Sequence, residues 1–186
     1  MPALPLPALP LPALARLALA VALPLPLLAG CGGDGAGFPP PCPRPSILRD
    51  ANDLFRYRGA GRDITDSVLE GRITGISGTC KRDGPDAVAA TVSVGIELTR
   101  GPAANSRTAD IAYFVAVSEG DRVLDKQVYQ LRAEFPENTD RVRLSGDSVD
   151  LRLPVTDKKT AAAYQITVGF QLSPAELQVN RARIGR

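Results

Sequence analysis

The sequence predicts an all-β fold, an antiparallel β-sandwich of the immunoglobulin-like or fibronectin-like kind, with six or seven strands and a short C-terminal helix. After residue 67, apolar residues recur at every second position, which is the pattern of half-buried strands. Polar turns separate these segments. The chain has five Phe, four Tyr and no Trp, so we expect a core built mainly from Val, Ile, Leu and Ala.

The expected strands follow one another along the chain. The first lies near residues 68–76 and the second near 88–98, where one face carries Val88, Ala90, Val92, Val94, Ile96 and Leu98. Residues 110–118 are apolar on both faces, which predicts a central strand. A Glu-Gly-Asp turn leads into a fourth strand near 123–135, and the last strand alternates from Tyr164 to Leu172.

Between residues 142 and 153 the apolar pattern changes phase. Val142 and Leu144 occupy even positions, whereas the apolar residues of the second part occupy odd ones: Val149, Leu151 and Leu153. A slip of one residue would turn the wrong face inward. We therefore expect a bulge or a turn at Ser-Gly-Asp 145–147.

The two ends of the domain carry helix signals. Apolar residues at 47, 48, 51, 54 and 55 fit one face of a short helix, and an edge strand broken at Asn52-Asp53 is the alternative. Near the other end, Ser173, Pro174 and Glu176 form a capping-box pattern that predicts a helix. Tyr164 is placed like the tyrosine corner of immunoglobulin-like domains, although this is a fold analogy and a small barrel is the alternative.

A leader precedes the predicted domain. Residues 17–28 are apolar but too few to cross a bilayer as a helix, which takes about 20 residues. The segment ends in Leu28-Ala29-Gly30-Cys31, which resembles the lipobox of bacterial lipoproteins. That resemblance implies a diacylglyceryl group on Cys31, cleavage before it and acylation of the new amino terminus, for example with palmitate. Arg16 is the first basic residue, so either it suffices for export or translation starts after Met1.

The composition divides the chain into three parts. Residues 1–30 are the expected signal peptide, 31–45 a Gly-rich and Pro-rich tether, and 46–186 a single β-sandwich domain. We expect a lipid-anchored protein of the cell envelope that faces the periplasm. Gly32 stands where Asp would retain some lipoproteins at the inner membrane, which favours the outer membrane.

Two further cysteines, Cys42 and Cys80, form an even pair in an exported chain. A disulfide is their expected state in an oxidising compartment. A redox or metal-binding pair is the alternative, but the chain has no Cys-x-x-Cys and no His.

Several segments of the predicted domain also resemble an uncharacterised set of small envelope lipoproteins from α-proteobacteria. These segments are Cys42-Pro43, Ile47-Leu48 with Asp50-Ala51, Gly78-Thr79-Cys80, residues 113–117, residues 169–172, Glu176-Leu177 and Asn180-Arg181. The resemblance implies a location and a fold, but no activity.

Composition argues against several functions. The absence of His excludes Ser-His-Asp catalysis and zinc sites that use imidazole. The net charge of +2, with basic and acidic residues interleaved, argues against nucleic-acid binding. We expect no cofactor, no metal and no enzymatic activity.

Three groups of polar residues are candidate sites. Paired aspartates, Asp63 with Asp66 and Asp83 with Asp86, suit turn and cap roles better than calcium binding. The arginines around Gly-Ala-Gly 59–61 suit a solvated turn better than an anion site: Arg56, Arg58 and Arg62. Asn180-Arg181 suits a structural lock.

The sequence thus favours a non-enzymatic lipoprotein that is held in the membrane by its lipid and binds or supports another envelope protein. A solute- or glycan-binding lipoprotein is the alternative, with a pocket near Tyr113 or Tyr57. A small hydrolase that uses carboxylates comes third.

Overall fold

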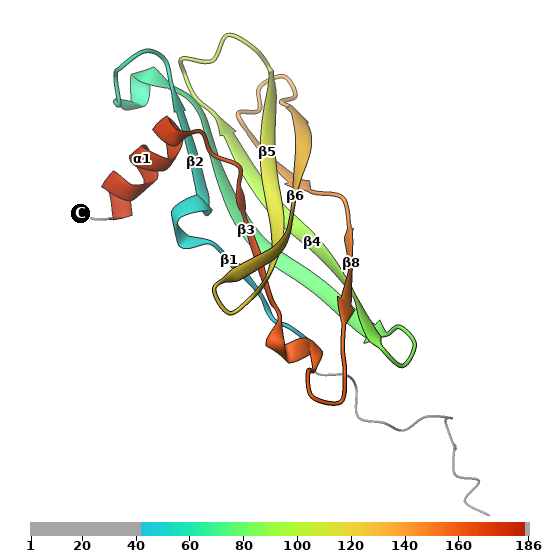
Figure 1. Ribbon diagram of the computed structural model, residues 1–186. Coiled ribbons are helices and arrows are strands. Elements are labelled where there is room, and N and C mark those ends of the chain that lie inside the picture. The colour runs from blue at the N-terminus through green and yellow to red at the C-terminus, as the bar shows by residue number, and fades with distance from the viewer. Residues whose placement is uncertain (1–41, 185–186) are drawn as a thin grey trace, which may run out of the picture. The chain divides into compact units, whose positions relative to one another are not determined.

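The computed structural model describes residues 42–184, which form two β-sheets and one α-helix (Figure 1). The first sheet has the strand order β1-β9-β5-β6, and the second has the order β2-β3-β4-β7, with β8 also paired to β4. The strands of the first sheet are β1 (Pro45–Ile47), β9 (Gln165–Phe170), β5 (Thr108–Glu119) and β6 (Arg122–Glu134). Those of the second are β2 (Asp53–Tyr57), β3 (Ser67–Arg82), β4 (Ala87–Arg100), β7 (Arg141–Ser145) and β8 (Val149–Pro154).

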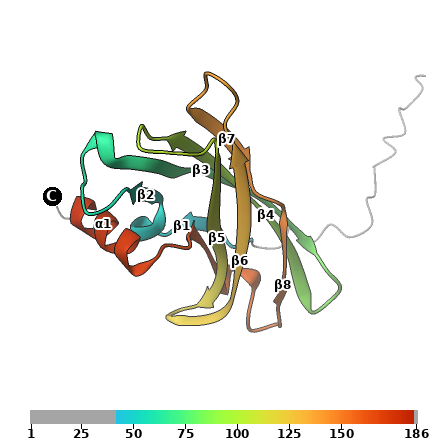
Figure 2. The ribbon, with the colours of Figure 1, turned by 90° about the horizontal axis from the view of Figure 1, so that it is seen from above.

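The expected all-β sandwich is confirmed, but residues 42–184 form nine strands and not the six or seven expected. All strand pairs are antiparallel except β1 with β9, which is parallel. The alternating residues of β4 point into one core shared by both sheets, and Val94 and Leu98 are fully buried there. Figure 2 shows the two layers, with α1 (Pro174–Ile184) beside β2.

Strand β5 is central in its sheet, between β9 and β6, as its two apolar faces predict. Its inner residues Ile111, Tyr113 and Val115 join the shared core. On its outer face, Phe114 and Ala116 form a second small cluster with Ala51. Because both faces of β5 are covered, the strand needs apolar residues at consecutive positions.

The phase shift at residues 145–147 is a turn between two strands, β7 and β8, that pair with successive parts of β4. Ser145 lies opposite Gly95, and Val149 lies opposite Val92. Gly146 donates its N–H to the Val94 carbonyl at 2.9 Å. A Cβ at this glycine would overlap the Tyr113 hydroxyl, so the turn requires Gly.

The short helix considered for residues 45–55 is wrong, and the alternative of a broken strand is correct. Strand β1 pairs with β9, a single 3₁₀ turn follows at Arg49–Ala51, and β2 pairs with β3. The segment therefore passes from one sheet to the other. Its two buried apolar residues, Ala51 and Leu54, pack against residues far away in the sequence, which local spacing cannot reveal.

The C-terminal elements match the expectation. The Ser173 backbone N–H donates to Glu176 Oε2 at 2.7 Å, and the Glu176 N–H donates to Ser173 Oγ at 3.3 Å, which completes the capping box of α1. Tyr164 is buried after a 3₁₀ turn (Ala161–Ala163), and its hydroxyl donates to the Pro154 carbonyl at 2.7 Å. This bond resembles a tyrosine corner, while the immunoglobulin-like assignment stays an analogy.

The predicted disulfide is present between Cys42 and Cys80, whose Cα atoms lie 6.2 Å apart. Cys42 precedes β1 in the first sheet and Cys80 belongs to β3 in the second, so the bridge joins the two sheets. Cys31, the signal peptide and most of the tether lie outside the described residues. Within residues 42–184, no helix has the length and apolar character needed to cross a membrane.

Candidate functional site at the loop end of the sandwich

Three loops meet at one end of the sandwich, the upper end in Figure 1: residues 58–66, 101–107 and 135–140. A cavity of about 450 Å³ lies among them. We call it the arginine pocket, because three of its lining side chains are guanidinium groups. Its lining includes Arg56, Arg58, Arg100, Asn105 and Asp110 with the apolar residues Val68, Leu69, Ala103, Ala104, Ala109 and Phe135.

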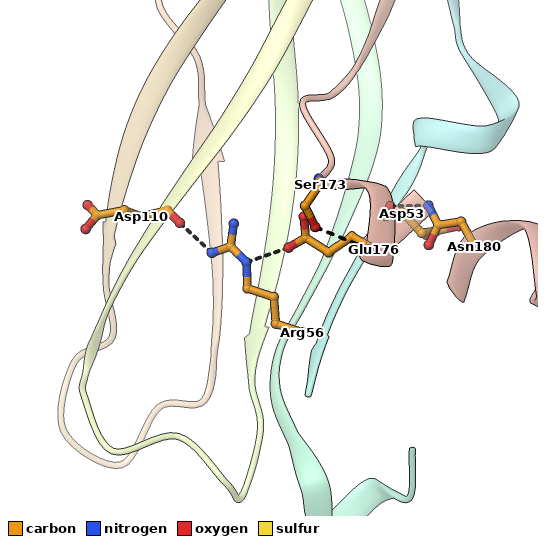
Figure 3. A network of polar contacts seen from close by, with 6 residues as sticks. All are labelled: Asp53, Arg56, Asp110, Ser173, Glu176 and Asn180. Atoms are coloured by element: carbon orange, nitrogen blue, oxygen red, sulfur yellow. Dashed lines mark hydrogen bonds and ion pairs between the residues drawn. The ribbon is translucent and has the colours of Figure 1, made fainter. Parts of the chain in front are cut away.

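Arg56 links helix α1 to the first sheet at the edge of this pocket (Figure 3). Its Nε donates to Glu176 Oε1 at 2.8 Å and its Nη1 donates to the Asp110 carbonyl at 2.6 Å. Burial by itself would raise the pKa of Glu176, but hydrogen bonds from the Ser173 backbone and from Arg56 hold that pKa below its usual value. The carboxylate that caps the helix therefore also fixes the Arg56 guanidinium.

Arg58 holds the loop that follows β4. Its Nη2 donates to the Ala103 carbonyl and to Asn105 Oδ1, the latter at 2.7 Å. Within residues 42–184, Arg58 forms no ion pair. Its acceptors in this part of the chain are uncharged oxygen atoms, so its positive charge is not neutralised there.

The next loop is held in the same way by Arg107. This guanidinium donates to three backbone carbonyls, those of Phe135, Pro136 and Thr139. Arg107 does not line the arginine pocket. Two neighbouring loops are thus each fastened by one arginine, one inside the pocket and one outside it.

The remaining charged lining residues are paired. Arg100 contacts Asp140 at 2.8 Å, and Asp110 contacts Arg132 at 2.8 Å. The hydrogen bond from Arg132 lowers the pKa of Asp110, which favours the ionised carboxylate. Asp110 is the single carboxylate among the lining residues, so the pocket does not supply the two facing carboxylates that hydrolases use.

The aspartate pairs have the predicted turn and cap roles. Asp63 and Asp66 form a capping box on the 3₁₀ turn Ile64–Asp66. Asp83 and Asp86 both contact Arg152, at 3.0 and 3.1 Å. No cluster of three or more metal-ligating His, Cys, Asp or Glu side chains occurs in the described part of the chain.

The arginines around residues 59–61 do not converge on one anion. Arg62 donates to the Gly61 carbonyl at 2.6 Å and lies over the Tyr57 ring, which fits the solvated turn. Arg56 and Arg58 instead line the pocket. Tyr57 lines a second hollow of about 360 Å³ that shares Arg56 with the first.

Tyr113 is a core residue and lines neither hollow. It is 1% exposed, and its ring stacks on Tyr129 at a centroid distance of 5.3 Å. Sequence reasoning missed two lining residues, Arg100 at the end of β4 and Asn105 in the loop that follows. No local motif marks them, because their pocket partners lie about 40 residues or more away in the chain.

The expected lock at Asn180-Arg181 is confirmed, but the two residues lie within helix α1 and not after it as the sequence suggested. Asn180 is 3% exposed, and its Nδ2 donates to the Asp50 and Asp53 carbonyls at 2.8 and 2.6 Å (Figure 3 shows the second bond). Arg181 contacts the Asp50 carboxylate at 3.0 Å. These bonds fasten α1 to the segment between β1 and β2.

Strand β6 carries a second candidate surface. It is the edge strand of its sheet, and three of its large apolar side chains are exposed: Val123, Leu124 and Val128, at 61%, 41% and 46%. Exposed apolar side chains that gather on one element favour contact with another protein.

Comparison of the chain with protein-family models, with curated proteins and with solved structures found no match. The function is therefore argued from the residues of this chain.

Proposed function

We propose that this chain is a lipid-anchored, non-enzymatic protein of the bacterial envelope that binds or supports another envelope protein. The observation that carries the proposal is the use of the three cysteines. Cys42 and Cys80 are joined to each other, and the remaining one, Cys31, ends the lipobox-like Leu-Ala-Gly-Cys segment after an apolar leader. A structural disulfide fits an oxidising compartment.

The disulfide also indicates the end at which the tether would enter the domain. Cys80 lies near the end of β3, whereas Val68 and Leu69 at its beginning line the arginine pocket. Twelve residues of strand separate Val68 from Cys80, which corresponds to about 40 Å. The tether would enter the domain at Cys42, so the chain that leads to Cys31 would leave the domain at the end opposite the arginine pocket.

A binding role is supported by two surfaces of the described domain. The exposed apolar side chains of β6 suit a protein partner, and the arginine pocket suits a smaller molecule. We favour the protein partner as the main function, because β6 exposes its apolar side chains along an unpaired sheet edge.

Acylation can be tested by metabolic labelling with palmitate and by detergent-phase partitioning. We expect the wild-type protein to incorporate the label and to enter the detergent phase, and Cys31→Ala to do neither. The matched control is the double variant Cys42→Ala/Cys80→Ala, which should keep the lipid. Unlabelled wild-type protein, or labelled Cys31→Ala, would refute the anchor.

The partner can be tested with a photo-crosslinking amino acid placed in the anchored protein. At Val128, on the exposed edge, we expect one discrete crosslinked protein product. At Thr79, which is exposed on β3 in the other sheet, we expect none. Equal crosslinking from both positions, or none from Val128, would contradict binding through β6.

A further inference from the structure

The charges that line the arginine pocket do not cancel. Arg56 and Arg100 are each paired with a carboxylate, Glu176 and Asp140, and the lining carboxylate of Asp110 is paired with Arg132. Arg58 is the one lining cation without such a partner among residues 42–184. An anion that enters the pocket would therefore meet positive charge that no carboxylate of this part of the chain neutralises.

Arg58 also keeps hydrogen-bond donors for a ligand. Both of its bonds, to the Ala103 carbonyl and to Asn105, come from Nη2. A guanidinium has five N–H donors, and in the described part of the chain those on Nε and Nη1 have no acceptor. The two bonds that are made hold the group in place, while its remaining edge can bind a carboxylate or a phosphate in the planar geometry that arginine favours.

The rest of the lining describes the other part of the ligand. Val68, Leu69, Ala103, Ala109 and Phe135 form an apolar wall. The one aromatic ring among them, that of Phe135, is 3% exposed and cannot serve as a stacking platform for a sugar. A cavity of about 450 Å³ is within the size range of sites for small organic molecules.

We propose that the arginine pocket binds a small organic anion with an apolar body, and that Arg58 recognises its carboxylate or phosphate group. The apolar body lies against Val68, Ala104 and Ala109, the apolar lining residues that are partly exposed. This inference goes beyond the proposed function and does not depend on the lipid anchor, because every residue it uses belongs to the folded domain. Failure of either proposal therefore leaves the other standing.

The competing explanation is that Arg58 only fastens its loop. The structure offers a matched control for this, because Arg107 fastens the neighbouring loop through backbone carbonyls without lining the pocket. Replacement of either arginine by Gln removes a loop fastening, but only Arg58→Gln removes a charge from the lining. Arg58→Lys keeps that charge but lacks the planar guanidinium whose Nη2 donates to the Ala103 carbonyl and to Asn105.

The test is calorimetric titration of the full chain, purified in detergent, with blank titrations into empty micelles. The probes are 4-phenylbutyrate, phenyl phosphate, inorganic phosphate and the neutral analogue 4-phenylbutanol. We expect both aromatic anions to bind with a Kd below about 1 mM, and both other probes to bind at least ten-fold more weakly, a difference of at least about 1.4 kcal/mol. Melting curves by circular dichroism confirm that each variant is folded.

Arg58→Gln should weaken the binding of both aromatic anions at least ten-fold, Arg58→Lys about three-fold, and Arg107→Gln less than two-fold. The proposal is overturned if neither aromatic anion gives saturable binding, or if 4-phenylbutanol binds as tightly as they do. Equal affinity for inorganic phosphate and phenyl phosphate would mean an adventitious ion only. Equal losses in Arg58→Gln and Arg107→Gln would mean that Arg58 only holds its loop.

Discussion

The disulfide between Cys42 and Cys80 should make a large contribution to the stability of this domain. The bridge closes a loop with a sequence separation of 38 residues. In the chain-entropy model, a loop of that length stabilises the folded state by about 4 kcal/mol. Domains of this kind are stable by only about 5–15 kcal/mol in total, so the bridge accounts for a substantial share.

The perturbation is the double variant Cys42→Ser/Cys80→Ser, compared with the wild-type protein in the presence and absence of dithiothreitol. Urea unfolding should show a free energy of unfolding that is lower by about 4 kcal/mol in the variant and in the reduced wild-type protein. For a domain of about 150 residues this corresponds to a melting temperature lower by roughly 10–15 °C. Dithiothreitol should not affect the variant.

The structure also predicts where the loss appears first. Strand β1 has only three residues, and the Leu48 N–H donates to the Val168 carbonyl at 2.8 Å just beyond it. Loss of the bridge should therefore increase the rate of deuterium exchange at the Leu48 amide. The increase should be larger there than at amides in the centre of β4, such as that of Val94. A loss of less than about 1 kcal/mol, with unchanged exchange at Leu48, would refute the reasoning.

Two further predictions concern helix α1. Asn180→Ala leaves the Asp50 and Asp53 carbonyls without their donor. We expect the free energy of unfolding, measured in urea, to fall by about 2–4 kcal/mol. A decrease below about 1 kcal/mol would contradict the proposed lock. The second prediction concerns pH, because the pKa of Glu176 is lowered in the folded state. The ionised Glu176 carboxylate therefore stabilises the fold fully above its unfolded pKa of about 4.3. This stabilisation is lost as the pH falls through the folded pKa. Glu176→Gln should therefore be less stable than wild type by about 1 kcal/mol at pH 7, and the difference should vanish near pH 2; a difference that is independent of pH would show that charge plays no part.

Most strands could be predicted because their burial has a local cause. In β4, alternate residues from Val88 to Leu98 face the core, so the period of two is visible in the sequence. The helix α1 was equally predictable, since its capping box lies within four consecutive residues, Ser173 to Glu176. Such features depend on residues that are close together in the chain, so they can be read from a single sequence.

The segment 45–57 shows where local reasoning fails. Its apolar residues at 47, 51 and 54 are spaced as on a helix, but their positions are set by pairing with Val168 and Gly71, which lie far away in the chain. The arginine pocket also depends on contacts between residues that are far apart in the chain. Arg58 meets Asn105 across 47 residues, and Arg56 meets Glu176 across 120, so no spacing rule could have brought them together.

The scarcity of aromatic residues offers a physical reason for the arginines at this end of the sandwich. Backbone carbonyls in loops need donors wherever water is excluded, and loops with few large apolar side chains have little else to hold them. Arg58 and Arg107 supply these donors, each to a different loop. A guanidinium that donates to carbonyls keeps its full positive charge, whereas a side-chain amide in the same place would be neutral. The fastening of the 101–107 loop therefore also gives the pocket its uncompensated positive charge, and comparison of Arg58→Gln with Arg107→Gln, which loses only a fastening, separates these two consequences.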